Sequence, residues 1–255
     1  MLTNPPLLVF DFDGVIVDGI FEYWWSPRRA CQKLSDGKFN SKALPETVPQ
    51  AFQFLRPWVH HGWEMVLLAA ELLRPESPLL LNGPIAFSTD YNLHCQQALK
   101  AWNWDSLQLQ QALEEVRQEA IDQNRDAWLA KHRAFHEVIK CLQCLKHEGL
   151  EWAVITTKGT SFTAELLKNF QLSPSLLFGH EAGSKTEILL RLNEKQDIKG
   201  FVEDRRSTLE NVLTTPGLTH LPCYLASWGY LKPEDLRLIP KGIHLLKLET
   251  LARPL

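Results

Sequence analysis

From about Arg133 onward, short apolar runs alternate with stretches whose apolar residues recur at helical spacing. The short runs fit strands that are buried on both faces, and the longer stretches fit amphipathic helices. Such alternation is typical of an α/β fold with three layers, in which helices cover both faces of a parallel sheet. The predicted strands cover residues 152–157, 176–179, 200–204 and 222–227, and the predicted helices cover 133–149, 163–170, 187–192 and 209–213.

The N-terminal segment supplies one more predicted strand of this sheet. Leu7–Phe10 is a short apolar run that follows two prolines and precedes acidic residues and Gly14.

Two of the later predicted helices have N-terminal capping signals in the sequence. Thr160 or Ser161 can cap the helix that follows the strand at 152–157, and Ser184–Glu187 has the pattern of a capping box.

The interval from residue 18 to residue 131 differs from the rest of the chain. It has few strand signals, and apolar residues recur at helical spacing in a glutamine-rich stretch. We therefore expect a mainly helical subdomain at 18–131, inserted into an α/β core made of residues 1–17 and 132–255. Seven of the nine tryptophans fall in this interval, where they could line a substrate pocket or pack the helices together.

Composition excludes some classes of function. The net charge is -3 and the pI is about 6.3, so the chain lacks the basic excess of proteins that track nucleic acid. No apolar run approaches the roughly 20 residues that span a bilayer, and the N-terminus lacks the basic segment of a secretory signal. We expect a cytoplasmic protein without a nucleic-acid or membrane partner.

The five cysteines agree with a cytoplasmic setting, because their number is odd and the chain is long enough to fold without disulfides. Cys141 and Cys144 form a CxxC pattern, and His147 follows three residues later. These residues could bind a metal or act in redox chemistry. The alternative, which we favour, is that the cysteines pack as small apolar residues in a helix.

The most informative short motif is Asp11-Phe12-Asp13-Gly14, directly after the first predicted strand. Ligands of open α/β sheets bind beyond the carboxyl ends of the strands. Side chains two residues apart on an extended chain point the same way, so both carboxylates can reach one crevice. One carboxylate could attack phosphorus while the other exchanges protons with the leaving oxygen and with water. A calcium loop is excluded because Ile16 stands where that loop needs glycine.

The segment VFDFDGVIVD resembles the first motif of the haloacid-dehalogenase (HAD) superfamily, in particular its phosphoglycolate-phosphatase-like branch with an insert after the first strand. The resemblance covers about residues 1–20 and 132–240. It implies that Asp11 is the nucleophile, that Asp13 is the general acid and base, and that both belong to the metal site. Gly14 is expected to allow the substrate to approach the backbone closely.

Two further segments resemble later motifs of the superfamily. AVITTKG is similar to the second motif, which implies that Thr156 binds the phosphoryl oxygens, with Thr157 as the alternative. Lys185 fits the third motif, in which a lysine offsets the charge of the nucleophile and the phosphoryl group. Its expected place at the start of a capped helix supports this role, since free N–H groups there favour anions.

FVEDRRSTLENV resembles the fourth motif, whose acidic residues hold Mg²⁺. The resemblance implies that Asp204 is a metal ligand, with Glu203 as a supporting acid or alternative ligand. The pattern departs from the family at Thr208, where relatives carry another aspartate, and Glu210 or Asn211 could replace the missing group. The later segment YLASWGYLKPEDLR is similar to the region that follows the fourth motif in this branch.

Together these motifs imply a Mg²⁺-dependent phosphatase that hydrolyses a small phosphorylated metabolite through an aspartyl-phosphate. A phosphomutase or phosphotransferase would use the same intermediate and pass the phosphoryl group to a hydroxyl. The departure at Thr208 also leaves open a regulatory module that binds phosphate or metal without turnover. The helical insert is expected to act as a cap that excludes water and selects the substrate. The substrate and the oligomeric state stay open.

Overall fold

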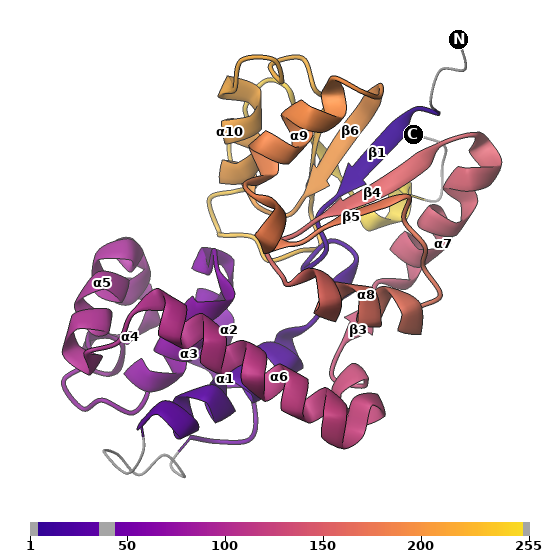
Figure 1. The fold of residues 1–255 in the computed structure, drawn as a ribbon. Coiled ribbons are helices and arrows are strands. Elements are labelled where there is room, and N and C mark those ends of the chain that lie inside the picture. The colour runs from indigo at the N-terminus through magenta and orange to yellow at the C-terminus, as the bar shows by residue number, and fades with distance from the viewer. Residues whose placement is uncertain (1–4, 36–43, 252–255) are drawn as a thin grey trace. The chain divides into compact units, whose positions relative to one another are not determined.

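The computed structural model describes residues 5–35 and 44–251. The chain divides into two compact units. The core unit combines the N-terminal segment up to Asp18 with the chain from Arg133 onward, and the helical unit is Gly19–His132. Figure 1 shows both units, with the inserted helices in violet and magenta.

The core unit is built on a six-stranded sheet in the order β5–β4–β1–β6–β7–β8, in which all neighbours are parallel. This confirms the prediction of a parallel α/β sheet. The strand β1, from the N-terminal segment, lies in the middle between β4 and β6. The strands are β1 (Leu7–Phe10), β4 (Glu151–Ile155), β5 (Leu176–Phe178), β6 (Ile198–Glu203), β7 (Cys223–Ala226) and β8 (Ile243–Leu246).

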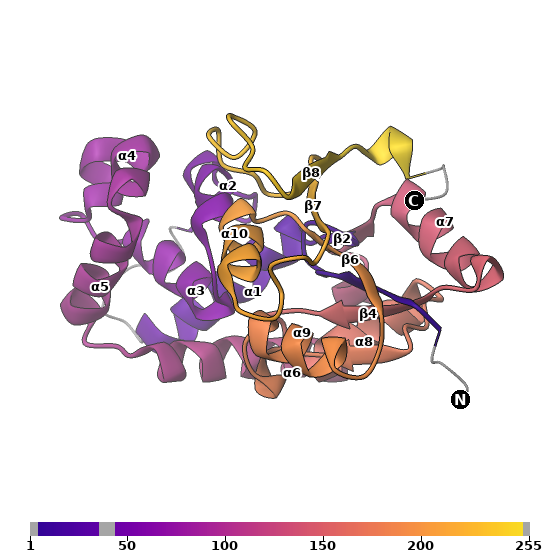
Figure 2. The same ribbon diagram turned by 90° about the horizontal axis from the view of Figure 1, so that it is seen from above.

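Helices cover the sheet on both faces, with α9 and α10 on one side and α7 and α8 on the other (Figure 1), and Figure 2 gives the same ribbon from above. Along the strands, alternate side chains pack against the helices on the two faces of the sheet. Leu7 and Val9 of β1 belong to the buried cluster that includes the apolar faces of α9 and α10. The helices are α7 (His136–Leu145), α8 (Thr160–Asn169), α9 (Lys185–Asn193) and α10 (Arg206–Thr214), and the short 3₁₀ helices are η3 (Lys146–Glu148), η4 (His180–Ala182) and η5 (Leu248–Thr250).

Two short strands of the core unit, one directly before the helical insert and one directly after it, pair with each other. The strand β2 (Val17–Asp18) runs antiparallel to β3 (Arg133–Ala134). The helix predicted at 133–149 therefore begins only at His136, because the first residues of that segment are extended. Two-residue strands leave no period in the sequence, so neither of them was predicted.

The start of α8 differs from the prediction, and that of α9 agrees with it. Gly159 is the N-cap of α8, so the prediction that Thr160 or Ser161 caps this helix is wrong. The backbone N–H of Thr160 donates instead to the carboxylate of Glu181, a residue distant in sequence. The capping box Ser184–Glu187 at the start of α9 is present, which confirms that prediction.

The helical unit contains no strand among its described residues. Its interior holds Trp24, Trp102 and Trp128, which agrees with a packing role for these three tryptophans. Glu22 and Arg117, both buried, form an ion pair between α1 and α6 with two N–O distances of 2.8 Å. The helices are α1 (Ile20–Ser35), α2 (Gln50–Leu55), η2 (Arg56–Trp58), α3 (Gly62–Glu71), α4 (Pro78–Thr89), α5 (Tyr91–Trp102) and α6 (Ser106–Leu129).

Two features bear on the class of protein. None of the helices in the described ranges is long and apolar enough to cross a membrane. All five cysteines are free thiols. Within the CxxC pattern on α7, Cys141 is partly buried and Cys144 is exposed, and His147 belongs to no metal-binding group found among the described residues.

Candidate active site

The carboxyl ends of three adjacent strands bring the candidate residues together. Asp11 follows β1, Thr156 follows β4, and Glu203 is the last residue of β6. In the sheet, Phe10 of β1 pairs with Val154 of β4 and with Val202 of β6, so the three strands end at nearly the same level. Residues that are far apart in sequence therefore meet at one edge of the sheet, as expected for a parallel α/β fold.

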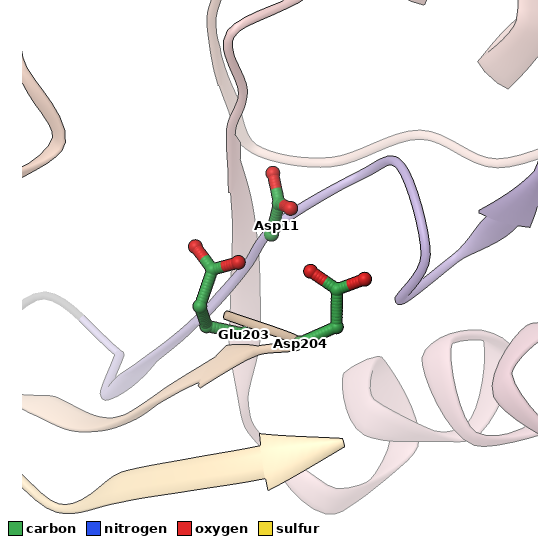
Figure 3. Close-up of side chains that lie close together, drawn as sticks. All are labelled: Asp11, Glu203 and Asp204. Carbon is green, nitrogen blue, oxygen red and sulfur yellow. The ribbon is translucent and has the colours of Figure 1, made fainter. Parts of the chain in front are cut away.

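Asp11, Glu203 and Asp204 form a compact acidic group at this edge. One oxygen of each carboxylate lies within 4.8 Å of an oxygen of the other two, and all three residues are buried. Figure 3 shows the three side chains close together, with Asp11 on the segment after β1. Three buried carboxylates repel one another strongly unless cations lie near them.

Lys185 supplies one such cation. Its Nζ atom lies 2.8 Å from Oδ1 of Asp11 and 2.6 Å from Oε2 of Glu203. It is the first residue of α9, and the capping box formed by Ser184 and Glu187 on either side of it fixes this end of the helix. Burial alone would lower the pKa of Lys185, but the Asp11 and Glu203 carboxylates outweigh burial and raise it. Lys185 is therefore a permanent positive charge in this site.

The site also shifts the ionisation of Asp11. Burial, with the nearby charges of Glu203 and Asp13, raises the pKa of Asp11 to about 7, although Lys185 acts in the opposite direction. Burial also raises the pKa of Glu203, and the charge of Asp204 adds to this effect. An additional cation beside these groups would favour their ionised forms.

Two glycines allow the close packing around Asp204. A Cβ atom on Gly14 would lie 1.9 Å from Oδ2 of Asp204, and one on Gly229 would lie 2.2 Å from the Cβ of Asp204. Gly14 also has a φ of 89°, which side chains rarely adopt. Gly14 thus makes room for a carboxylate of the protein, a function that its predicted role in substrate approach did not include.

The Trp228–Tyr230 segment after β7 fixes the loop that carries the first motif. Trp228 donates from Nε1 to the carbonyl oxygen of Val15 at 3.1 Å. Tyr230 donates from its backbone N–H to Oδ2 of Asp204 at 2.7 Å and from its hydroxyl to Oδ1 of Asp18 at 2.6 Å. These contacts explain why a Trp-Gly-Tyr sequence accompanies the acidic motif.

Comparisons with solved structures show the same architecture over nearly the whole chain. A predicted phosphoglycolate phosphatase from Haemophilus somnus 129pt superposes with a TM-score of 0.60 at 16% identity, covering 99% of this chain and 98% of the other. A HAD-superfamily hydrolase of subfamily IA from Geobacter sulfurreducens PCA gives 0.53 at 14%, covering 98% and 96%. A candidate β-phosphoglucomutase from Thermotoga maritima gives 0.53 at 13%, covering 96% of each.

The chain has the haloacid-dehalogenase-like fold. The sequence itself matches no protein-family model and no curated protein. At these low identities the HAD-like fold is what the likeness shows.

The residues that follow β4 divide between buried and exposed positions. Thr156 is buried, and its Oγ1 accepts the backbone N–H of Lys158 at 3.1 Å. Thr157 is exposed. Lys158 is buried and its Nζ lies 3.5 Å from Oδ2 of Asp13. The sequence prediction did not include Lys158, because a single lysine in a sequence is far more often a surface residue.

The predicted metal site differs in part from the observed acidic group. The carboxylate of Asp13 does not belong to the group formed by the other three acids; it faces Lys158 instead. Glu203 belongs to the group, but both of its oxygens accept hydrogen bonds, from Lys185 and from the backbone N–H of Arg205. Asp11 and Asp204 could thus hold a metal ion, with Glu203 either as a further ligand or as a supporting acid.

Neither residue suggested as a replacement for the missing aspartate joins this group. Glu210 forms an ion pair with Arg206, with an N–O distance of 2.8 Å, one helical turn away on α10. Asn211 is exposed on the same helix. Both were reasonable candidates from sequence spacing, but Glu210 is not a member of the acidic group found among the described residues.

Proposed function

We propose that this protein is a Mg²⁺-dependent phosphatase that hydrolyses a small phosphate monoester through an aspartyl-phosphate at Asp11. The observation that carries the proposal is the position of the Asp11 carboxylate. It contacts the Nζ atom of Lys185, and one of its oxygens lies within 4.8 Å of a carboxylate oxygen of Asp204. A nucleophilic carboxylate, a fixed cation and a further metal-binding carboxylate are what phosphoryl transfer requires, because it depends mainly on alignment and charge neutralisation.

The reaction proceeds in two steps. In the first, an oxygen of Asp11 bonds to phosphorus, the ester oxygen leaves with the bonding electrons, and Asp13 gives it a proton. In the second, Asp13 takes a proton from water while that water attacks the phosphorus and releases Asp11. Lys185 and the hydroxyl of Thr156 bind phosphoryl oxygens, since both are fixed at the same sheet edge as the nucleophile.

The acidic group fits a magnesium ion. Mg²⁺ prefers a few carboxylates, water and substrate phosphate, and Asp11 and Asp204 offer such oxygens. Of the four acidic side chains at the site, Asp11 and Glu203 lie beside Lys185 and Asp13 lies beside Lys158, and a divalent cation would offset further negative charge. When bound, Mg²⁺ would lower the repulsion between the nucleophile and the phosphate dianion.

The helical unit is proposed to be the part that selects the substrate. It enters and leaves the core unit through β2 and β3, which pair with each other directly after the loop of the first motif. An insert whose two ends are joined in this way can move as one body. We propose a small phosphorylated metabolite as the substrate and the cytoplasm as the location.

The direct test is the release of inorganic phosphate by the purified protein. We expect hydrolysis of p-nitrophenyl phosphate and of a panel of phosphorylated metabolites in Mg²⁺, and its loss in EDTA and in Asp11→Asn. Asp197→Asn is the matched control, because Asp197 is an exposed aspartate paired with Lys199. Phosphate release without an added acceptor supports hydrolysis, whereas release only with an acceptor alcohol would indicate a phosphotransferase. No turnover of any ester would contradict the proposal.

A further inference from the structure

Lys158 is a buried lysine that the proposed reaction has not yet used. Its side chain is 2% exposed, and its Nζ lies 3.5 Å from Oδ2 of Asp13. The backbone holds it on both sides: its N–H donates to Oγ1 of Thr156, and its carbonyl oxygen accepts the N–H of His180 at 3.2 Å. The backbone of Lys158 is therefore fixed, and its ammonium group lies beside the carboxylate of Asp13.

A buried ammonium group is unfavourable unless an anion lies beside it. The two buried lysines of the site are assigned to different acids. Lys185 contacts Asp11 and Glu203, whereas Lys158 lies beside Asp13. The nucleophile and the proton-transferring acid thus each have a separate cationic partner, on different elements of the core unit.

We propose that Lys158 is a positioning residue that holds the carboxyl group of Asp13 in the orientation needed for proton transfer. This inference rests on the proposed function. An ammonium group only donates hydrogen bonds, so Oδ2 of Asp13 must act as an acceptor toward it. The proton that Asp13 gives to the leaving oxygen is then carried by Oδ1. Lys158 itself neither gains nor loses a proton in either step.

The inference predicts a dependence on the leaving group. An alkyl phosphate releases a strongly basic oxygen that needs a proton as the ester bond breaks, whereas p-nitrophenolate leaves readily as an anion. The parameter to compare is kcat/KM, because it reports the steps up to the formation of the aspartyl-phosphate. Replacing a residue that acts through Asp13 should therefore lower kcat/KM for the alkyl phosphate much more than for p-nitrophenyl phosphate.

The test compares Lys158→Met with wild type on an alkyl phosphate and on p-nitrophenyl phosphate. We expect kcat/KM to fall about 100-fold or more for the alkyl ester and less than about 10-fold for the aryl ester, since general acid catalysis contributes about 10²–10⁴-fold. Lys158→Arg, which keeps the charge, should recover part of the loss. The ratio of the two substrates does not depend on the folded fraction, and Lys158→Gln replaces Lys158→Met should the latter not fold.

Lys185→Met is the comparison variant, and it should lower kcat/KM for both esters to a similar extent. Equal losses for the two esters in Lys158→Met would overturn the inference, because a lysine that binds phosphate or only stabilises the fold affects both alike. An unchanged kcat/KM for the alkyl ester would overturn it too. Wild-type protein without Mg²⁺-dependent phosphate release would instead refute the proposed function, so the two failures are distinguishable.

Discussion

The Nζ atom of Lys185 lies 2.8 Å from Oδ1 of Asp11, at the junction between the first residue of α9 and the end of β1. Both side chains are largely buried, so water screens their attraction little. The same ammonium group contacts Glu203. One lysine therefore neutralises part of the charge that the fold concentrates at this edge of the sheet.

Replacing Lys185 with methionine should damage both activity and stability. Without the ammonium group, the carboxylates of Asp11 and Glu203 stay buried and lose their cationic partner. We expect this loss to lower the free energy of unfolding by about 3 kcal/mol. The rate kcat should fall about 100-fold or more, because a fixed charge beside the developing phosphoryl charge is lost. Urea unfolding and steady-state kinetics measure the two effects. Lys199→Met, at an exposed lysine, should change neither, and near-wild-type kinetics in Lys185→Met would contradict the assignment.

Gly14→Ala should disrupt the position of Asp204. The added Cβ would lie 1.9 Å from Oδ2 of that carboxylate, and the φ of Gly14 is positive. Gly149→Ala separates the two effects, because Gly149 also has a positive φ but nothing lies within 4 Å of the added atom. We expect both variants to lose about 1 kcal/mol from backbone strain, and only Gly14→Ala to lose Mg²⁺ affinity as well. Calorimetric Mg²⁺ titration and thermal unfolding of both variants decide the matter, and equal Mg²⁺ affinities would refute the packing argument.

Asp204→Asn and Glu210→Gln test the composition of the metal site. Asp204 belongs to the buried acidic group, whereas Glu210 pairs with Arg206 on α10. We expect the first substitution to raise the Kd for Mg²⁺ by about 100-fold and the second to leave it within about twofold, since even residues behind the ligands typically contribute 10–100-fold. Titration of activity against Mg²⁺ concentration is the measurement. A large effect of Glu210→Gln would restore that residue to the metal site.

The raised pKa of Asp11 predicts how the stability of the metal-free protein depends on pH. Burial, first of all, raises that pKa to about 7, whereas an aspartate in the unfolded chain titrates near 3.9. Between these values the folded protein keeps a proton that the unfolded chain has lost, so the contribution of Asp11 to stability falls as pH rises toward and through 7. Asn at this position cannot ionise and avoids that loss.

We therefore expect Asp11→Asn to gain stability over wild type, in EDTA, by on the order of 4 kcal/mol between pH 4 and pH 8. Denaturant unfolding of both proteins at the two pH values provides the difference, in which the titration of other groups largely cancels. Asp197→Asn, at an exposed aspartate, should show no such change. A stability difference for Asp11→Asn that is the same at both pH values would show that the pKa of Asp11 is not raised.

Much of the core unit could be predicted because its signals are local. Leu7–Phe10 is bounded by prolines and acids and forms β1 as expected, and the capping box at Ser184–Glu187 opens α9. Buried strands of a parallel sheet are apolar along their whole length, which makes them visible in a sequence. The meeting of Asp11, Lys185 and Glu203 followed from strand order, since parallel strands bring their carboxyl ends to one edge.

Other features depend on tertiary contacts and left no readable pattern. The edge strand β8 has exposed residues at His244 and Leu245 in its middle, so it lacks the continuous apolar run of the central strands. The N-terminus of α8 is satisfied by Glu181 from a later segment, which no local capping rule identifies. The pairing of Lys158 with Asp13 joins the ends of two strands, and a single lysine in a sequence is far more often a surface residue.

Asp11 is expected to become phosphorylated during turnover, and chemical trapping of the aspartyl-phosphate is a direct test. Asp13→Asn, which lacks the base for the second step, is mixed with p-nitrophenyl phosphate and Mg²⁺, quenched, and reduced with borohydride, which converts an aspartyl-phosphate to homoserine. Peptide mass spectrometry should find homoserine at position 11, dependent on both substrate and Mg²⁺. If the wild-type enzyme is active but the trapped label falls on another residue, or on none, then Asp11 is not the nucleophile.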